Sequence, residues 1–245
     1  MSRYRLLIEY DGTPFVGWQR QASDVSVQGV VEQAFKALCG QDVHVQCAGR
    51  TDAGVHATGQ VAHVDLPKDY PPDTVRDAAN HHMRPHPVAV VAAERVGDDF
   101  HARFFATGRA YVYRILNRRA PGVLDRHRAW WVPMRLDHGL MAEAAQHLLG
   151  THDFTSFRAA ECQAKSPVKT LDRLDVRREG EMIVVDAAAR SFLHHQVRNM
   201  VGTLKLVGEG KWRPERVLQA LEARSRAAAG PTAPPEGLYL TTVRY

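Results

Sequence analysis

The chain has 245 residues, of which 44% are hydrophobic and 24% are charged, and its formal net charge is +5. This composition is ordinary for a soluble globular protein, and the length suits one large domain or two small ones. The chain has no run of about 18 apolar residues, so no transmembrane helix is expected. Its first residues lead into a strand pattern rather than a signal peptide.

Six elements are predicted for the first half. They are a strand over 4–10, a helix from the cap Ser26 to Gly40, strands over 43–47 and 61–64, a helix over 71–83 and a strand over 88–96. The helix ends carry a serine and a glycine, which are the usual start and stop residues. The order β-α-β-β-α-β is the ferredoxin-like pattern that RNA-recognition domains also use.

The second half repeats this plan loosely. The pattern predicts strands over 111–115 and 130–132, a helix over 136–149, an irregular polar segment over 151–169, strands over 168–176 and 182–188, a helix whose apolar face runs from 193 to 207, a short helix over 214–222, an Ala/Pro linker over 227–236 and a last strand over 237–243. We therefore expect two halves, residues 1–105 and 106–245.

The charge is divided unevenly between these halves. Residues 1–105 carry a net charge of −3, whereas residues 106–245 carry +8. The basic segment 109–135 holds seven arginines and one acidic residue, with Tyr111, Tyr113, Trp130 and Trp131 interleaved. Cations for the phosphates and flat rings for the bases are typical of proteins that bind single-stranded or loop RNA. The alternative is a solvated basic face.

The three cysteines, at positions 39, 47 and 162, are odd in number and widely spaced. This favours a reducing compartment, and we expect the protein in the cytoplasm. The alternative to a chemical role is that each cysteine is simply a small buried hydrophobic residue.

The polar segment 47–63, between two predicted strands, holds the candidate catalytic residue Asp52. In the sequence Asp52 is flanked by Arg50 and by small residues, and three glycines allow the backbone to bend and another chain to approach closely. Such a loop can present a reactive acid from a rigid scaffold. The alternative is a hairpin turn whose Asp and Thr side chains satisfy their own backbone.

Residues 49–56, Gly-Arg-Thr-Asp-Ala-Gly-Val-His, resemble the signature of the tRNA pseudouridine synthases of the TruA type. Four further segments resemble that family's other motifs: 10–19, 109–113, 191–202 and 231–240. The resemblance therefore runs over nearly the full chain. It departs at Arg190 and Ser191, where relatives often carry Asn and a small residue, which leaves the detail of the pocket open.

The resemblance implies a role for four side chains. Asp52 would be the essential carboxylate, attacking the sugar or the base covalently or taking the ribose 2′ proton. Tyr111 would stack on the uracil, the alternative being a core tyrosine on an alternating strand. Arg198 would pair with Asp52 and orient it in its ionised form. Arg50 would help to flip the nucleotide or hold its phosphate, the alternative being a structural partner of Asp52 or of a neighbouring carbonyl.

No metal and no cofactor are expected. His194 and His195 are adjacent, but no Cys or acidic residue lies at ligand spacing, and H-E-x-x-H is absent from the sequence. Detaching the uracil, turning it and reattaching it through carbon needs neither redox partner nor metal. The reaction does need the target uracil to be flipped out of the base stack of the RNA.

The resemblance further implies a fold and a substrate. The fold class is α+β, with two ferredoxin-like halves whose antiparallel sheets join across a central active-site cleft. The targets are uridines 38, 39 and 40 in the anticodon arm of tRNA, held by a homodimer, with no membrane involved. The rivals are a tRNA-binding protein without chemistry and an Asp-dependent RNA hydrolase, which usually needs clustered acids for a metal.

Overall fold

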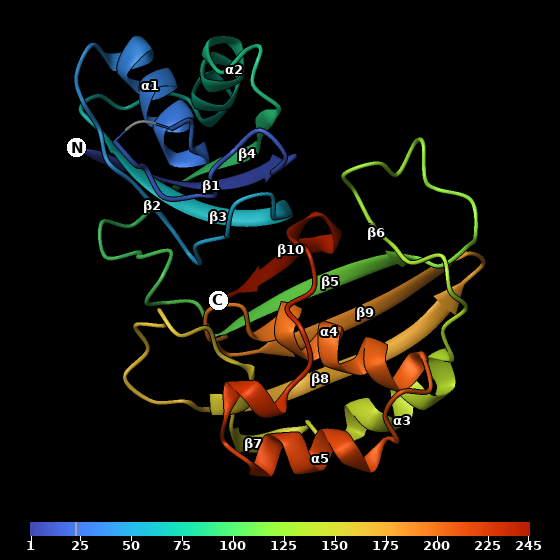
Figure 1. Ribbon diagram of the computed structural model, residues 1–245. Helices are drawn as coiled ribbons and strands as arrows, with labels where there is room; N and C mark the ends of the chain where they lie inside the picture. The colour runs from blue at the N-terminus through green and yellow to red at the C-terminus, as the bar shows by residue number, and fades with distance from the viewer. Residues whose placement is uncertain (23) are drawn as a thin grey trace. The chain divides into compact units, whose positions relative to one another are not determined.

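The computed structural model describes residues 1–22 and 24–245 (Figure 1). The chain has a mixed α+β fold and divides into two compact units. Unit 1 comprises residues 1–107 and 239–245, and unit 2 comprises residues 108–238. The last strand, which the sequence analysis assigned to the second half, therefore packs mainly in unit 1. Among the described residues, no helix is both long and apolar enough to cross a membrane.

Unit 1 is built from the predicted order of elements: β1 (Ser2–Tyr10), α1 (Val27–Cys39), β2 (Val45–Cys47), β3 (His56–Leu66), α2 (Pro72–His82) and β4 (Val88–Val96). Strand β1 lies between β4 and β3 and is antiparallel to both, and β2 is antiparallel to β3. Strand β10 (Leu238–Arg244) pairs with β3 in parallel, so the expected antiparallel arrangement does not hold for this pair of strands.

The ends of α1 follow from its sequence. The Ser26 hydroxyl accepts a hydrogen bond from the Gly29 amide at 3.2 Å, and Gly40 ends the helix with φ 76°. Both caps are as predicted. Alternate residues of β1 are buried, including Tyr4, Leu6 and Ile8, so one face of the sheet forms the core. Helices α1 and α2 pack together over that sheet (Figure 1).

A buried histidine lies on the opposite face of this sheet, where His63 pairs with Arg5 rather than with Tyr4 or Leu6. His63, on β3, is 3% exposed, and its Nδ1 accepts a hydrogen bond from the Ala102 amide at 3.2 Å. Its ring meets the edge of the His101 ring at 4.7 Å between centroids. Burial, with smaller contributions from His101 and Arg3, lowers the pKa of His63 to about 4. The fold therefore favours the neutral imidazole.

Unit 1 is expected to lose stability as the pH falls from about 6.5 to about 4, because in this window the unfolded state binds more protons at His63 than the folded state. The loss in free energy of unfolding from this group should be at most about 1.4 kcal/mol per pH unit, reached in the middle of the window. His63→Asn keeps an acceptor near the Nδ1 position and cannot titrate. Urea titrations at several pH values should show a shallower acid loss for the variant; equal slopes would contradict the assignment.

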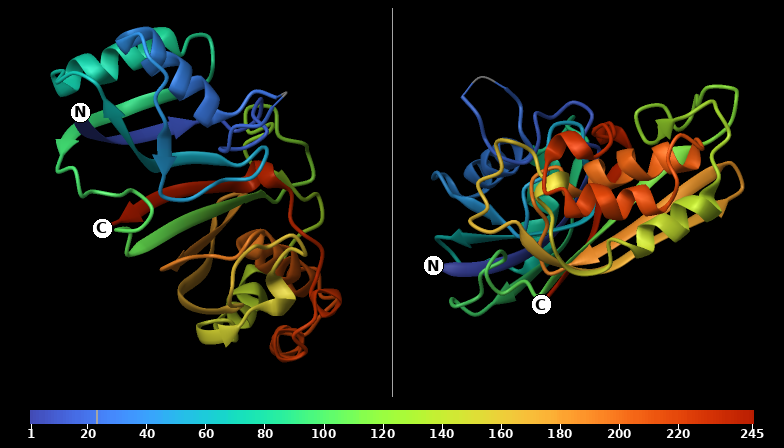
Figure 2. Two further views of the ribbon diagram at one scale, coloured as in Figure 1. Left: turned by 90° about the vertical axis from the view of Figure 1, so that its left-hand side faces the viewer. Right: turned by 60° about the horizontal axis from the view of Figure 1, so that its bottom comes forward.

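Unit 2 is built from β5 (Gly108–Leu116), β6 (Trp130–Trp131), α3 (His138–Gln146), β7 (Gly150–Asp153), β8 (Val168–Glu179), β9 (Met182–Ala189), α4 (Gln196–Gly208) and α5 (Glu215–Glu222). Its strands follow the order β5-β9-β8-β7 with antiparallel pairs, and β6 pairs in parallel with β5. Figure 2 shows α3, α4 and α5 gathered on one face of this sheet.

Two predictions for unit 2 are corrected. The segment 151–169, expected to be irregular throughout, contains most of β7 and a turn of 3₁₀ helix at Thr155–Phe157, because Phe154 and Phe157 are fully buried and anchor it. The helix expected from residue 193 begins at Gln196, since His195 has φ 62°, which lies outside the helical region.

Candidate active site

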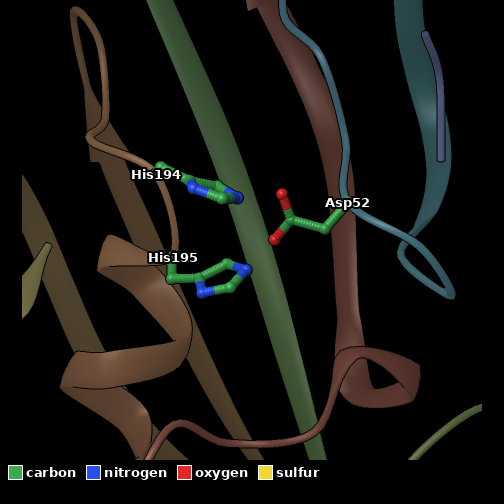
Figure 3. A group of neighbouring side chains, drawn as sticks. All are labelled: Asp52, His194 and His195. Atoms are coloured by element: carbon green, nitrogen blue, oxygen red, sulfur yellow. The ribbon is translucent and has the colours of Figure 1, made fainter. Parts of the chain in front are cut away.

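Asp52 lies in the loop between β2 and β3, residues 48–55, which we call the Asp52 loop. Its side chain is half-buried and projects from the loop (Figure 3), while Thr51 before it is buried and Arg50 is exposed. The Val55 amide donates to the Asp52 carbonyl at 3.1 Å, and Gly54 has φ 75°. The loop is therefore a tight turn that places the acid just before β3.

The segment 10–19, whose role the sequence left open, supports the Asp52 loop. The Trp18 amide donates to the Thr51 carbonyl at 3.0 Å, and the Gly54 amide donates to the Phe15 carbonyl at 3.3 Å. The Tyr10 and Thr51 hydroxyls are hydrogen-bonded at 2.8 Å. The Trp18 ring is 2% exposed and anchors the segment in the core. Asp52 is thus carried by a loop whose backbone is fixed on both sides.

Two glycines make this close contact possible. A Cβ at position 12 would lie 2.1 Å from the Val55 carbonyl oxygen, and one at position 17 would lie 2.5 Å from the Thr51 carbonyl oxygen. Gly17 also has φ 104°, which disfavours any side chain. The family resemblance marked both positions without indicating this purpose.

A third support was missed by the sequence analysis. Gln60 on β3 is fully buried, and its Nε2 donates to the Gly49 carbonyl at 2.7 Å, below the start of the Asp52 loop. Because Gln60 stands within the polar segment 47–63, its residue type alone did not indicate this buried role. Nearby, burial raises the pKa of the Cys47 thiol to about 12, so this thiol stays protonated at neutral pH.

In unit 2, the two tyrosines of β5 have different environments. Tyr113 is fully buried, donates its hydroxyl to the Pro234 carbonyl at 2.7 Å and has a pKa raised by burial. Tyr111 is partly exposed, and its ring meets the Phe192 ring edge-on with centroids 5.2 Å apart. Tyr113 is therefore the structural tyrosine, and Tyr111 is the one with an accessible surface.

Arg198 lies in the first turn of α4 and is hydrogen-bonded to Ala233. Its Nε donates to the Ala233 carbonyl at 2.8 Å, and the Ala233 amide donates back to the Arg198 carbonyl at 3.1 Å. Just before α4, the rings of His194 and His195 lie side by side, 4.0 Å apart (Figure 3). The His194 carbonyl accepts from the Ala159 amide at 3.0 Å, so this approach to the helix is also fixed.

The four predicted site residues fall into two groups. Asp52 and Arg50 share one loop of unit 1, and Tyr111 and Arg198 belong to β5 and α4 of unit 2. Two contacts at these residues were not predicted from the sequence: the Phe192 ring beside Tyr111 and the Ala233 carbonyl that accepts from Arg198. Neither has a clear signal in the sequence, because one contact is a ring edge and the other is a backbone group.

Comparison with known proteins defines the class. The family model described as tRNA pseudouridine synthase matches residues 6–104 and 144–245. Such enzymes are isomerases, since they rearrange a uridine without adding or removing atoms. Among solved structures, a chain of a Cbf5-Nop10-Gar1 complex is 11% identical, with a TM-score of 0.36, and the match covers 97% of this chain and 49% of that one.

Three curated relatives, all called tRNA pseudouridine synthase A, match the whole chain. The protein of Paramagnetospirillum magneticum is 70% identical, with 96% of its own length covered. Those of Xanthobacter autotrophicus and Rhodopseudomonas palustris are 62% and 60% identical, with 100% of each covered. The chain belongs to the tRNA pseudouridine synthase family, in its TruA branch, which confirms the resemblance drawn from the motifs.

Proposed function

We propose that this protein converts uridine to pseudouridine at positions 38, 39 and 40 of the anticodon stem-loop of tRNA. Membership of the TruA branch supports the reaction and the substrate. The observation that carries the proposal is the Asp52 loop, which holds one carboxylate on a backbone fixed by Trp18 and Phe15. A rigid scaffold that presents a single acid suits a reaction that needs a positioned carboxylate.

Each site residue has a proposed role. Asp52 is the essential carboxylate, and three routes fit it: attack on the sugar, attack on the base, or removal of the 2′ proton. Tyr111 stacks on the flipped uracil, which its partly exposed ring supports. Arg198 orients Asp52 in its ionised form. Arg50, which is exposed, contacts a phosphate of the flipped nucleotide.

The finer architecture is also a proposal. We infer two ferredoxin-like halves whose residues complete one active-site cleft, and a homodimer that binds tRNA. The order β-α-β-β-α-β in unit 1, with β1 between β4 and β3, supports the ferredoxin-like plan for that half. We place the protein in the cytoplasm, which the three free cysteines support.

One experiment separates this proposal from its rivals. Unmodified tRNA is incubated with the purified protein, and its nucleosides are analysed by mass spectrometry and by chemical mapping of pseudouridine. Pseudouridine at positions 38–40, formed equally with and without EDTA, is expected. Binding without modification would favour a tRNA-binding protein, and a cleaved strand would favour an RNA hydrolase. Activity that requires a divalent metal for more than tRNA folding would contradict the metal-free reaction.

Substitution of Arg198 is expected to give a graded loss. Arg198→Lys keeps the charge but loses the planar guanidinium and the Nε bond to the Ala233 carbonyl. Its single-turnover rate should fall about tenfold, whereas Arg198→Ala should lose about 100-fold or more, the effect of removing a catalytic hydrogen-bond donor. Normal turnover by Arg198→Ala would show that Arg198 is a phosphate contact or a structural residue.

The affinity for tRNA is expected to depend strongly on salt. Residues 108–238 carry 21 Lys and Arg against 14 Asp and Glu, a net charge of +7. A plot of log Kd against log salt concentration should be linear, with a slope of roughly 0.7 to 0.9 for each phosphate contact. Arg119→Ala, in the basic segment 109–135, should reduce that slope, and Arg76→Ala on α2 should not. A flat plot would exclude unit 2 as the binding surface.

A further inference from the structure

A strap of unit 2, residues 226–233, runs along α4 on its way to β10. The contact is made by backbone. A Cβ at Gly202 of α4 would lie 1.8 Å from the Pro231 carbonyl oxygen, and one at Gly230 would lie 2.8 Å from the Thr203 Cα. The Thr203 hydroxyl accepts from the Gly230 amide at 2.9 Å and donates to the Asn199 carbonyl at 2.7 Å. These contacts therefore fix the position of the strap along the axis of α4.

Arg226 joins this strap to the helix through three neutral acceptors. Its Nη1 donates to the Gly230 carbonyl at 2.8 Å, and its Nη2 donates to the Thr232 hydroxyl at 3.1 Å and to Asn199 Oδ1 at 3.2 Å. The Thr232 hydroxyl donates to the same Asn199 oxygen at 2.7 Å. Burial lowers the pKa of Arg226, yet an arginine keeps its charge in proteins. Within residues 1–22 and 24–245, the acceptors of Arg226 are all neutral. Partial desolvation of a cation that has no acidic partner there costs free energy, so a structural or functional role should offset that cost.

Arg226 bonds to Asn199 and Thr232, and each of these is adjacent in sequence to one member of the hydrogen-bonded pair Arg198 and Ala233. Asn199 follows Arg198 in α4, and Thr232 precedes Ala233 in the strap. Asn199 is itself fixed, since it is fully buried and donates its Nδ2 to the Phe157 carbonyl at 2.8 Å. A shift of the strap along α4 would thus move the Ala233 carbonyl, which accepts from Arg198 Nε. Because the guanidinium is planar, the acceptor at Nε sets the direction of its other nitrogens.

We propose that Arg226 is a positioning residue for the reaction: it locks the strap to α4 so that the Ala233 carbonyl holds the Arg198 guanidinium in its working orientation. This inference rests on the proposed function, in which Arg198 orients the catalytic carboxylate. It predicts a loss in the chemical step that depends on Arg198, with little effect on tRNA binding.

The test is a double-mutant cycle between Arg226→Met and Arg198→Lys, measured as single-turnover pseudouridine formation at saturating enzyme. Arg226→Met should lower the rate at least tenfold in the wild-type background and less than twofold in Arg198→Lys. The Kd for tRNA, measured in parallel, should stay within twofold. Residues that act as one unit give such non-additive effects.

Arg224→Met is the matched control, because it removes the same charge from an exposed side chain two residues away. Equal losses for Arg224→Met and Arg226→Met, or equal factors for Arg226→Met in both backgrounds, would overturn the proposal. If Arg226→Met is unfolded at the assay temperature, Thr232→Val takes its place, since it removes one hydroxyl of the same connection and should show the same dependence on Arg198. A wild-type protein that forms no pseudouridine would refute the proposed function instead.

Discussion

Asp52→Asn is expected to form no detectable pseudouridine while it binds tRNA with nearly wild-type affinity. The amide has the shape of the carboxylate but is neither a nucleophile nor a base, so any of the three routes is lost, and the rate should fall at least about 1,000-fold. Affinity rests mainly on cations that contact phosphates, and Asp52 is not one of them. The fold should persist, because the Asp52 loop is held through the backbone at Thr51 and Gly54.

The measurement pairs single-turnover kinetics with a binding titration on the same preparation. Asp42→Asn serves as the control, because it removes an acidic charge from an exposed position of unit 1, where Asp42 pairs with Lys36 at the surface. This variant should keep wild-type turnover. Near-normal turnover by Asp52→Asn would remove Asp52 from the catalytic role and leave its loop as a structural turn.

Elements that follow from local chemistry were predictable from the sequence. Helix α1 begins and ends at the residues that its serine and glycine indicate, and β4 has the predicted bounds. In each case the residues that indicate the element lie within it or directly at its ends. The motifs also located the Asp52 loop between two strands, since the polar, glycine-rich run interrupts two apolar patterns.

Contacts between distant segments could not be predicted in this way. The parallel pairing of β10 with β3 joins residues more than 180 positions apart, so no local pattern shows it. The apolar spacing predicts that α4 starts at Leu193, three residues before its actual start, because the positive φ of His195 is set by the surrounding structure. The support of the Asp52 loop by Gly12 and Gly17 depends on the same kind of long-range approach.

Gly17→Ala is expected to lower the rate of pseudouridine formation about 100-fold in a protein that is still folded. The added methyl would lie 2.5 Å from the Thr51 carbonyl oxygen and 3.0 Å from the Asp52 carbonyl carbon, and both are backbone atoms that cannot turn away. Relief requires the Asp52 loop to move by about 1 Å, a displacement that can cost about 100-fold when it misplaces a catalytic group. Stability should also fall, because φ 104° at this position disfavours a side chain.

Gly40→Ala separates the two effects, because Gly40 also has a positive φ, 76°, but a Cβ there would meet no atom within 4 Å. This control should lose about 1 kcal/mol of stability from backbone strain and keep the wild-type rate. Rates are compared well below both melting temperatures, which are measured by circular dichroism. If Gly17→Ala turns over like Gly40→Ala, the segment 10–19 stabilises the fold without positioning Asp52. If only Gly17→Ala loses the rate while its tRNA affinity is retained, the close packing of this segment against the loop is what places the carboxylate for the reaction.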